Sequence, residues 1–573
     1  MTQNHPPQGE LNVKDKAFLE AALSSLKTGK DAWATMSLDK RIELLEKVID
    51  GIRSVAFEWV QLSCKAKGID AESPLAAEEW LAGPYTTLRN LRLLKISLVQ
   101  LSKGQPPKLP KRPFKSTEGR WRVPVYPTDI YDSLFFMGTR AEVWLDENAN
   151  PDDFAKNLAH SYLKDDPSAG AISLVLSAGN VSSIGPLDAV HKLFHEKQVV
   201  LVKSHPVNDY LQPLLEKAFA PLITGNFIRF VKGGAKEGDF LCNHPDIADI
   251  HITGSDKTHD AIVFGPDADV KKATGTPRLQ KKITSELGNV SPLIVVPGPW
   301  TSADLAYQAE NIASSLANNA GFNCNATRVV LTHAQWPLRQ ELLTGIRRTF
   351  ASLPARPGYY PGAKERFQQF IEVHPEAETF GGQGSVDLPW TFIPGVSPTQ
   401  PDDICFQKEA FCSLFCEAPM DAETMQDFVQ KAVEFANTQL WGSLNVTLLV
   451  HPKTMKDPEM GNAVTEAIRA LRFGTVSINH WAAVGFAMGS TPWGAYPGHS
   501  LYDIRSGIGV VHNTYMLEHV EKAVISGPFR AFPKPSWFVT CKNGRSLGEK
   551  LVQFEHKPSP WKIPGIFWSA LRG

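Results

Sequence analysis

The sequence predicts an α/β protein in which parallel sheets are covered by helices, and two observations support this fold class. Four apolar runs rich in β-branched residues follow one another between residues 171 and 255, and helical segments such as 207–219 separate them. Continuous apolar runs are typical of parallel strands that are buried on both faces. Because ligands of such sheets bind beyond the carboxyl ends of the strands, we expect the chemistry there.

The elements can be placed along the chain from their composition. Residues 15–100 predict mainly helix, because apolar residues from Leu38 to Ile52 recur at helical spacing. Residues 103–122 are rich in Pro, Lys and Arg; they favour a solvated connector, with a polybasic recognition element as the alternative. Two strand-like runs, VPVY and AEVWL, follow within 123–145 and are separated by a turn at Gly138. The later strand-like runs are AISLVLS (171–177), VVLVK (199–203), FIRFV (227–231), IADIHITGS (247–255), LIVVPG (293–298) and TRVVLT (327–332).

Composition excludes several classes of protein. The chain has 573 residues, of which 43% are hydrophobic and 21% charged, so it is long enough for two or three globular domains. Lys and Arg number 59 against 60 Asp and Glu, so no global charge points to nucleic acid or an anionic membrane as partner. The sequence has no long uninterrupted apolar stretch, so it does not predict an integral membrane span.

Cysteine usage and the first residues predict a cytoplasmic location. Seven scattered cysteines, with no Cys-x-x-Cys pair, predict neither a disulfide framework nor a metal site. The segment Met1–Glu10 is polar and lacks the apolar region of a secretory signal.

Four residues stand where chemistry could occur, and each also has an ordinary structural explanation. Cys324, in NNAGFNCNATRVV, precedes a strand-like run, where a turn could hold a reactive thiolate; most intracellular cysteines are nevertheless buried and inert. Glu286, in TSELGNVSP, is a possible base or a surface residue. The Asn180 amide, after AISLVLS, could line an oxyanion hole or stabilise a turn. Lys203 ends VVLVK, where it could bind ribose or phosphate or remain solvated.

The order and spacing of these residues match one family. The segments that carry the match are SAGN ending at Asn180, VVLVKSHP, ITGS (252–255), SELGNVSP, GFNCNATR, KEAF (408–411), GTVSINH (474–480) and TPWGAYPGHS (491–500). Over about residues 165–510 the chain resembles the aldehyde dehydrogenase superfamily.

The resemblance implies a mechanism. Cys324 would attack an aldehyde carbonyl, and the oxyanion would be held by the Asn180 amide and the Cys324 backbone N–H. After hydride transfer to NAD or NADP, Glu286 would activate water to hydrolyse the thioester and release a carboxylic acid.

The resemblance also implies the cofactor site. Lys203 and Glu409 would position the two riboses, Phe411 would pack beside the nicotinamide, and Ser255 would face the pyrophosphate or the helix that carries it. The full set of implied cofactor residues is Lys203, Gly254, Ser255, Leu287, Glu409 and Phe411.

Several positions depart from the family pattern. Asn289 replaces the second glycine of the Glu-Leu-Gly-Gly box, and Ala178–Gly179–Asn180 replaces Pro-Trp-Asn, a form that resembles the acyl-CoA reductase branch. Pro206 stands where an acidic residue often follows the ribose lysine, so NAD and NADP both stay open. The alternative functions are therefore an acyl-CoA or acyl-thioester reductase and an inactive structural relative, while Glu286 favours hydrolysis.

By resemblance the fold has three parts. Residues 1–122 and 150–290 would form a Rossmann-type dinucleotide-binding domain, and 291–488 an α/β catalytic domain. Residues 123–149 and 489–573 would form a β-rich bridging and oligomerisation element with a C-terminal extension. In the family such hairpins extend a neighbour's sheet, so the resemblance implies a homodimer or homotetramer.

The chain after Glu518 is rich in Phe, Trp, Pro and Lys and shows no helical periodicity. We expect it to pack on the chain's own body, with contact to another subunit or peripheral contact with a membrane as alternatives.

Overall fold

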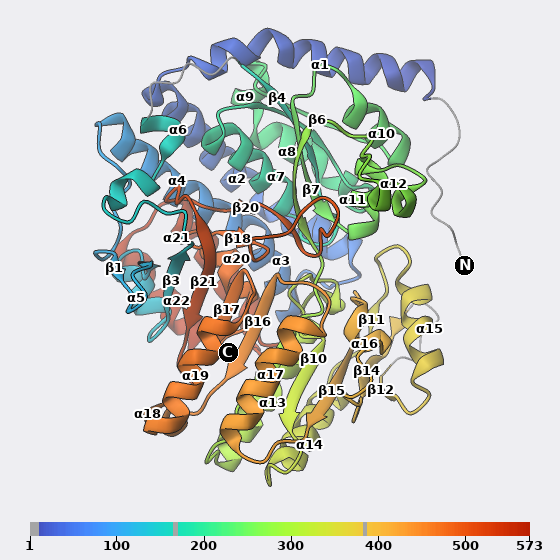
Figure 1. Ribbon diagram of the computed structural model, residues 1–573. Helices are drawn as coiled ribbons and strands as arrows, with labels where there is room; N and C mark the ends of the chain where they lie inside the picture. The colour runs from blue at the N-terminus through green and yellow to red at the C-terminus, as the bar shows by residue number, and fades with distance from the viewer. Residues whose placement is uncertain (1–10, 164–169, 382–386) are drawn as a thin grey trace.

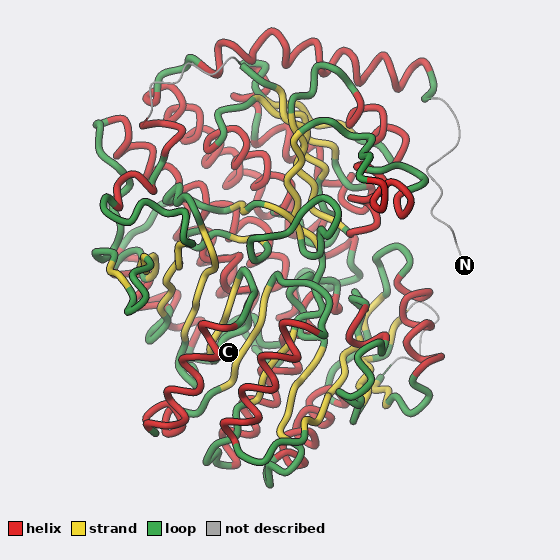
Figure 2. The backbone as a smooth tube through the Cα atoms, in the orientation of Figure 1, coloured by secondary structure: helices red, strands yellow, loops and turns green. Residues whose placement is uncertain are grey.

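The computed structural model describes residues 11–163, 170–381 and 387–573 (Figure 1). The polar segment Met1–Glu10 lies outside the described residues. Within these ranges the strands form two large sheets, each flanked by helices, and two small two-stranded sheets (Figure 2). The predicted α/β class with parallel sheets is confirmed. In the described part of the chain, no helix is both long enough and apolar enough to cross a membrane.

The smaller of the large sheets contains six strands in the order β19-β8-β7-β4-β5-β6. All neighbours are parallel except the short β19, which is antiparallel to β8. Its strands are β4 (Ile172–Leu176), β5 (Val199–Lys203), β6 (Ile228–Val231), β7 (Asp249–Gly254), β8 (Lys282–Leu287) and β19 (Gly507–Ile508). The strands match the apolar runs of the sequence because side chains on both faces are buried.

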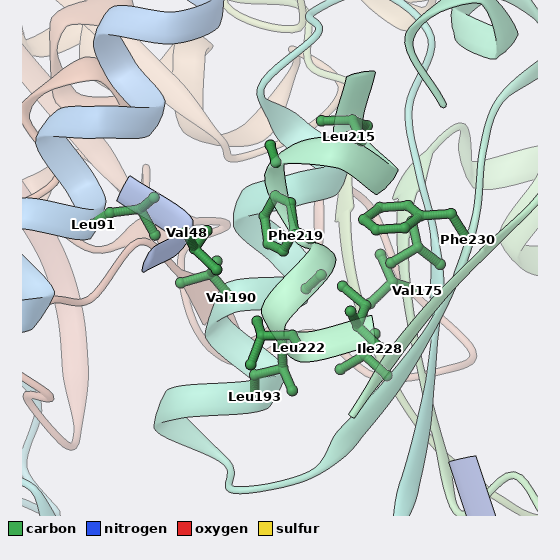
Figure 3. Packing of buried hydrophobic residues seen from close by; sticks show 14 of the residues in the cluster. Val48, Leu91, Val175, Val190, Leu193, Leu215, Phe219, Leu222, Ile228 and Phe230 are labelled. Atoms are coloured by element: carbon green, nitrogen blue, oxygen red, sulfur yellow. The ribbon is translucent and has the colours of Figure 1, made fainter. Parts of the chain in front are cut away.

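Helices cover both faces of this sheet. Helix α1 packs along β4, β5 and β6, and α7 packs on β4 and β5. These helices and their neighbours are α1 (Val13–Ala34), α2 (Leu38–Ala66), α4 (Thr86–Ser102), α7 (Ile184–Val190), α8 (Gln212–Ala218), α9 (Ala220–Thr224), α10 (Ala235–Asn243), α11 (Asp256–Val263) and α12 (Ala268–Thr274). Figure 3 shows Val48 of α2, Leu91 of α4 and Val190 of α7 in one core cluster with Val175 and Ile228 of the sheet.

The larger sheet contains eleven strands within the described residues, in the order β1-β2-β3-β21-β17-β16-β9-β10-β15-β14-β12. From β21 to β14 every pairing is parallel. Its strands are β1 (Phe114–Lys115), β2 (Trp121–Tyr126), β3 (Arg140–Leu145), β9 (Pro292–Val295), β10 (Val329–His333), β12 (Glu378–Phe380), β14 (Trp390–Ile393), β15 (Leu414–Met420), β16 (Asn445–Leu449), β17 (Thr475–Ile478) and β21 (Val520–Ser526).

Two helix layers sandwich this sheet. Side chains of α13 and α14 join one cluster with Leu293 and Val330, and those of α17 and α19 join another with Ile294 and Val329. Successive strand residues therefore face opposite layers. The helices are α13 (Ser302–Ala317), α14 (Arg339–Ala351), α15 (Ala363–Val373), α16 (Ile404–Gln407), α17 (Met425–Thr438), α18 (Pro452–Lys456), α19 (Pro458–Ala470) and α20 (Ala483–Met488).

The expected strand pair at 123–149 is present, and it joins the sheet of its own chain. Strands β2 and β3 are antiparallel, and their connection contains α5 (Ile130–Phe135) before Gly138. On its other side β3 pairs with β21, which in turn lies parallel to β17. Figure 1 shows β3, β21, β17 and β16 side by side. The pairing that the resemblance led us to expect with a neighbour's sheet is thus made within the chain.

The interpretation that the chain after Glu518 shows no helical periodicity is wrong. Helices α21 (Gly544–His556) and α22 (Ile563–Ala570) follow β21, and α21 packs against α2, α3 and α4. Leu547, Leu551 and Phe554 face inward at helical spacing, a pattern masked by the surrounding Pro and aromatic residues.

The remaining elements are short. They are α3 (Ala77–Trp80), α6 (His160–Leu163), β11 (Arg356–Pro357), β13 (Asp387–Leu388), β18 (Trp493–Gly494), β20 (Val510–Val511), η1 (Pro74–Ala76), η2 (Leu81–Tyr85), η3 (Phe154–Asn157), η4 (His191–His195), η5 (Pro206–Leu211), η6 (Asn318–Gly321) and η7 (Pro560–Lys562).

Candidate active site

Cys324 lies in the turn between η6 and β10, where the backbone is strained and is held by several side-chain hydrogen bonds. Asn319 and Ala320 have φ values of 54° and 55°, a left-handed conformation that costs a non-glycine residue about 1–2 kcal/mol. The turn is fixed from within and from outside. The Asn319 amide donates to Phe322 O at 3.0 Å, and the Arg328 guanidinium donates to Cys412 O at 2.6 Å and also to Gly321 O. The thiol is therefore held on a pre-formed turn.

Asn180 reaches this turn from the end of β4. Its side chain is 5% exposed, and Nδ2 donates to Phe322 O at 3.0 Å, two residues before Cys324. Its own carbonyl accepts hydrogen bonds from Lys67 Nζ and Asn319 Nδ2, both at 3.0 Å. These contacts hold the carboxamide against the turn that carries the thiol.

Glu286, on β8, completes the group around the thiol. Its carboxyl lies beside the Cys324 thiol and the Trp493 indole, and Oε1 is buried without a hydrogen-bond partner among the described residues. Burial raises the pKa of Glu286 to about 7, so the group can act as a base near neutral pH. Burial, followed by the charge of Glu286, raises the pKa of Cys324 well above its usual value. The thiol is thus protonated in the free protein and has a carboxylate at hand.

Glu409 approaches the same region from the other sheet. Its Oε2 would lie 2.0 Å from a Cβ placed on Gly288, so only glycine admits this contact. Burial raises the pKa of Glu409 to about 7, and within the part of the chain that the structure describes its Oε1 has no hydrogen-bond partner. Phe411 follows with φ of 42° and its ring lies 5.9 Å from that of Phe322, while Leu287 is buried and donates its backbone N–H to Ser506 O.

Lys203 and the Gly254–Ser255 turn lie at carboxyl ends of the six-stranded sheet. Lys203 is 9% exposed, and its amine donates a long hydrogen bond of 3.4 Å to Ser204 O. Burial lowers its pKa. Gly254 and Ser255 are exposed, and the Ser255 hydroxyl caps α11 by accepting from Thr258 N at 3.2 Å. The N-terminus of α11 suits an anionic ligand.

The two main departures from the family pattern have local structural reasons. The Asn289 side chain is buried and donates to Asn445 O at 2.9 Å and Ser291 Oγ at 3.2 Å; Ser291 Oγ in turn donates to Cys324 O at 3.1 Å. Asn289 therefore supports the thiol turn. A Cβ on Gly179 would lie 2.4 Å from His205 Nδ1, so the larger residue of Pro-Trp-Asn would collide with His205.

Sequence reasoning missed several residues around the thiol. Phe486 and Trp493 pack against Cys324, and of these two only Trp493 lies in a segment that carries the family match, TPWGAYPGHS. The Tyr360 ring stacks on His205 at 5.6 Å and lies 5.0 Å from that of Phe411. No motif marks Tyr360, because the loop that contains it has neither strand nor helix periodicity.

A buried polar network behind Glu286 was also missed. On neighbouring strands Thr253 is paired in register with Glu286, and its hydroxyl donates to Asp188 at 3.0 Å. His251 Nε2 lies 3.6 Å from Asp188, and burial lowers the pKa of His251 to about 3. The signal available in the sequence was a histidine and a threonine on one face of the strand that ends in ITGS.

Comparison with known proteins gives one family match and several relatives. A model described as the Aldehyde dehydrogenase family matches residues 209–359. An aminoacetaldehyde dehydrogenase of Pseudomonas aeruginosa is 26% identical over 294 residues, which cover 48% of this chain and 51% of the relative. The human 4-trimethylaminobutyraldehyde dehydrogenase is 34% identical over 100 residues, 17% of each protein. The chain thus spans about half or less of these curated relatives.

Solved structures match over most of the chain. A mutant aldehyde dehydrogenase C of Pseudomonas syringae, complexed with NAD+ and octanal, has a TM-score of 0.60 at 15% identity and covers 89% of both chains. An NADP-dependent glyceraldehyde-3-phosphate dehydrogenase of Bacillus halodurans, complexed with NADP, has a TM-score of 0.57 at 16% identity and covers 89% of this chain and 91% of its own. At these identities the likeness shows the fold.

Proposed function

We propose that the chain is a member of the aldehyde dehydrogenase superfamily, an NAD(P)-dependent oxidoreductase that oxidises an aldehyde to a carboxylic acid; the family match to residues 209–359 and the shared fold support this. The observation that supports this most strongly is the contact between the Cys324 thiol and the Glu286 carboxyl, with the Asn180 amide on the same turn. A buried nucleophile, a base and an oxyanion donor are the groups that acyl chemistry on cysteine requires.

The residues present fit a dinucleotide cofactor. Lys203 Nζ and Glu409 Oε1 are buried and have weak or no hydrogen-bond partners, which suits ribose hydroxyl groups. Gly254 and Ser255 at the start of α11 would hold the pyrophosphate, and Phe411 would lie beside the nicotinamide. When bound, the nicotinamide ring supplies the hydride acceptor.

The first half of the reaction forms a bond to Cys324. Glu286 accepts the thiol proton, and the sulfur attacks the aldehyde carbonyl to give a thiohemiacetal. The Asn180 amide and the Cys324 backbone N–H donate to the oxyanion, and one such donor contributes about 3–4 kcal/mol in comparable sites.

The second half releases the acid. Once the thiohemiacetal is oxidised, a thioester remains on Cys324. Glu286 first releases the thiol proton to solvent and is again a carboxylate. It then takes a proton from water, and the hydroxide attacks the thioester; the sulfur leaves as a thiolate, which recovers a proton to restore the Cys324 thiol, and the acid is freed.

The surroundings of the thiol favour an apolar aldehyde. Leu444, Trp493 and Val511 are buried against Cys324 and Phe486. Trp481, by contrast, donates its indole N–H to Asn325 O and stacks on Trp537, and Trp441 packs in another cluster. Phe486 and Trp493 are therefore the aromatic residues that we propose to contact the substrate beside the thiol.

A specific experiment tests this assignment. Purified protein is assayed for the absorbance of reduced nicotinamide with a panel of aldehydes, with each of NAD and NADP, and with and without coenzyme A. We expect turnover with apolar aldehydes without coenzyme A, and Cys324→Ala to abolish turnover while dinucleotide binding survives. Turnover by Cys324→Ala within tenfold of the parent contradicts the assignment. Faster turnover with coenzyme A, yielding acyl-CoA, favours the acyl-CoA reductase alternative.

Partners and location stay predictions. We propose a small aldehyde as substrate, with no nucleic-acid partner, and a cytoplasmic location. A homodimer or homotetramer is still proposed from the resemblance, but its interface must use a surface other than β21, since both edges of β21 are paired within the chain.

A further inference from the structure

Four side chains with metal-binding atoms meet on the side of the larger sheet that faces α17. His374 follows α15, Asp403 and Cys405 lie at the start of α16, and Cys416 lies in β15. His374 Nε2 is 3.1 Å from Asp403 Oδ1, and one ligand atom each of His374, Asp403 and Cys405 lie within 4.8 Å of one another. The Cys405 thiol also contacts the Cys416 thiol and the His374 ring.

The spacing suits a tetrahedral ion. Zinc binds nitrogen and oxygen at about 2.0–2.2 Å and sulfur at about 2.3 Å, so its ligand atoms lie about 3–4 Å apart. The ligand atoms of His374, Asp403 and Cys405 need shift little to reach such positions. The Cys416 thiol contacts Cys405 but lies outside this group of three, so it would have to move toward the ion. One imidazole, one carboxylate and two sulfur ligands select zinc over magnesium or calcium, which prefer oxygen alone.

The histidine is already oriented as zinc sites require. Its Nδ1 is 2.8 Å from Glu376 Oε1, which leaves Nε2 directed at Asp403 and Cys405. An outer carboxylate on the far nitrogen fixes the ring of a metal-ligating histidine. The four side chains are shielded: His374 is 7% exposed, the Asp403 side chain 8% and Cys405 4%, and Cys416 is completely buried.

We propose that His374, Asp403, Cys405 and Cys416 bind one zinc ion that joins the end of α15 and the turn at α16 to strand β15. The sequence predicted no metal, because the ligands come from separated positions and form no Cys-x-x-Cys pair. The ion would have a structural role, since protein atoms supply all four ligands. Cys405 lies four residues before Glu409 in the sequence, so the ion would also fix the position of the segment that carries Glu409.

A zinc ion would account for the approach of the Cys405 and Cys416 thiols, which the ion pair of His374 with Asp403 does not explain. Without metal, a protonated His374 would pair with Asp403 and Glu376, and the two thiols would be mere neighbours. With zinc, His374 and both thiols lose their protons and all four groups share one partner. Metal content separates these two states.

The test measures zinc in the full chain. Protein produced in zinc-supplemented medium should contain about one zinc ion per chain by mass spectrometry, as expected of a closed four-ligand site. His374→Gln and Cys405→Ser should each lower the content at least tenfold. Cys412→Ser is the matched control, because Cys412 is a buried thiol of the same cluster that is not a proposed ligand, and it should keep its zinc.

Two further measurements keep the proposal testable if a variant fails to fold. Cobalt added to chelator-treated parent should give the sulfur-to-cobalt charge-transfer band and the strong visible bands of tetrahedral cobalt. A chelator should lower the melting temperature of the parent and leave that of Cys405→Ser unchanged. Absence of zinc together with absence of the cobalt spectrum overturns the proposal, and so does equal zinc in the parent, His374→Gln and Cys405→Ser. The outcome does not depend on aldehyde turnover.

Discussion

At the scale of single residues, Glu286 has two tasks that can be separated kinetically. Its carboxyl contacts the Cys324 thiol and is buried, with its pKa raised to about 7. It would accept the thiol proton before the first step and a water proton in the second. Attack on the aldehyde is also assisted by Asn180 and by the turn at Cys324. Hydrolysis of the thioester, by contrast, depends on Glu286 to activate the water.

We expect Glu286→Gln to slow deacylation about 10²–10⁴-fold, the usual contribution of a general base, and to slow acylation less. Rapid mixing should then show a burst of reduced nicotinamide followed by slow turnover. In the parent, turnover should rise with pH up to about 7 and level off above it, because hydrolysis needs the carboxylate and the raised pKa keeps the group protonated below that value.

The variant itself provides the control, since glutamine does not titrate and the rise toward pH 7 should vanish. An equal loss of burst and steady-state rate would show that Glu286 is not the hydrolytic base.

At the scale of elements, the turn η6 is a case of local strain. Ala320 has φ of 55° and is buried, directly before the thiol segment. Glycine adopts this conformation freely, whereas alanine pays about 1–2 kcal/mol. The hydrogen bonds of Asn319 and Arg328 hold the turn against that strain.

We therefore predict that Ala320→Gly is less destabilising than Ala313→Gly by about 1–2 kcal/mol. Both alanines are buried, but Ala313 lies inside α13, where glycine is unfavourable. Chemical denaturation of the two variants measures the difference in the free energy of unfolding. Equal losses would mean that the left-handed backbone at Ala320 carries no strain.

The strands of the six-stranded sheet could be predicted from the sequence, whereas the contacts between segments far apart in the sequence could not. VVLVK is β5 residue for residue, because a strand buried on both faces must be continuously apolar. The motifs also placed Cys324, Glu286 and Asn180 as candidates. What sequence could not supply were long-range approaches: His205 against Gly179, Asp188 against Thr253, and β21 beside β17. Such contacts depend on side-chain packing between distant segments and leave no periodic signal.

At the scale of the whole molecule, α21 closes a buried ionic network. Glu555 accepts hydrogen bonds from Arg89 at 2.9 Å and Arg92 at 2.6 Å, and Arg89 also donates to Asp132 at 2.9 Å. The side chains of Arg89, Asp132 and Glu555 are each at most 4% exposed. The C-terminal helix thus neutralises cations of α4, although the two lie far apart in the sequence.

Glu555→Ala should cost about 3–5 kcal/mol of folding free energy, because it leaves buried guanidinium groups with too little negative charge. Glu549→Ala is the matched control on the same helix, since the hydrogen bond of Glu549 to Gln553 spans 3.4 Å and no buried cation depends on it. Thermal melts of both variants decide the point. Similar melting temperatures would show that the network contributes nothing net.

The segment between β21 and α21 binds the body of the chain just as closely. Phe529 packs at 5.1 Å from Trp300, Lys534 pairs with Glu310 at 2.9 Å, and Val539 N donates to Ser314 Oγ at 3.1 Å. These partners include two residues of α13, so the segment runs along a helix of the larger sheet. Packing on the chain's own body, the first of the three uses expected for the tail, accounts for these contacts.

Deletion of residues 528–573 should therefore lower the melting temperature strongly and leave the mass in light scattering that of the parent, apart from the residues removed. A smaller oligomer would instead assign the tail to subunit contact. Two exposed tryptophans distinguish membrane contact from packing on the chain's own body. They are Trp561, which is 91% exposed, and Trp568, which is 61% exposed. The double variant Trp561→Ser with Trp568→Ser should melt like the parent, because neither ring is buried, and should bind anionic vesicles no less than the parent does. If the parent binds vesicles and the double variant does not, although both melt at the same temperature, the tail contacts the membrane.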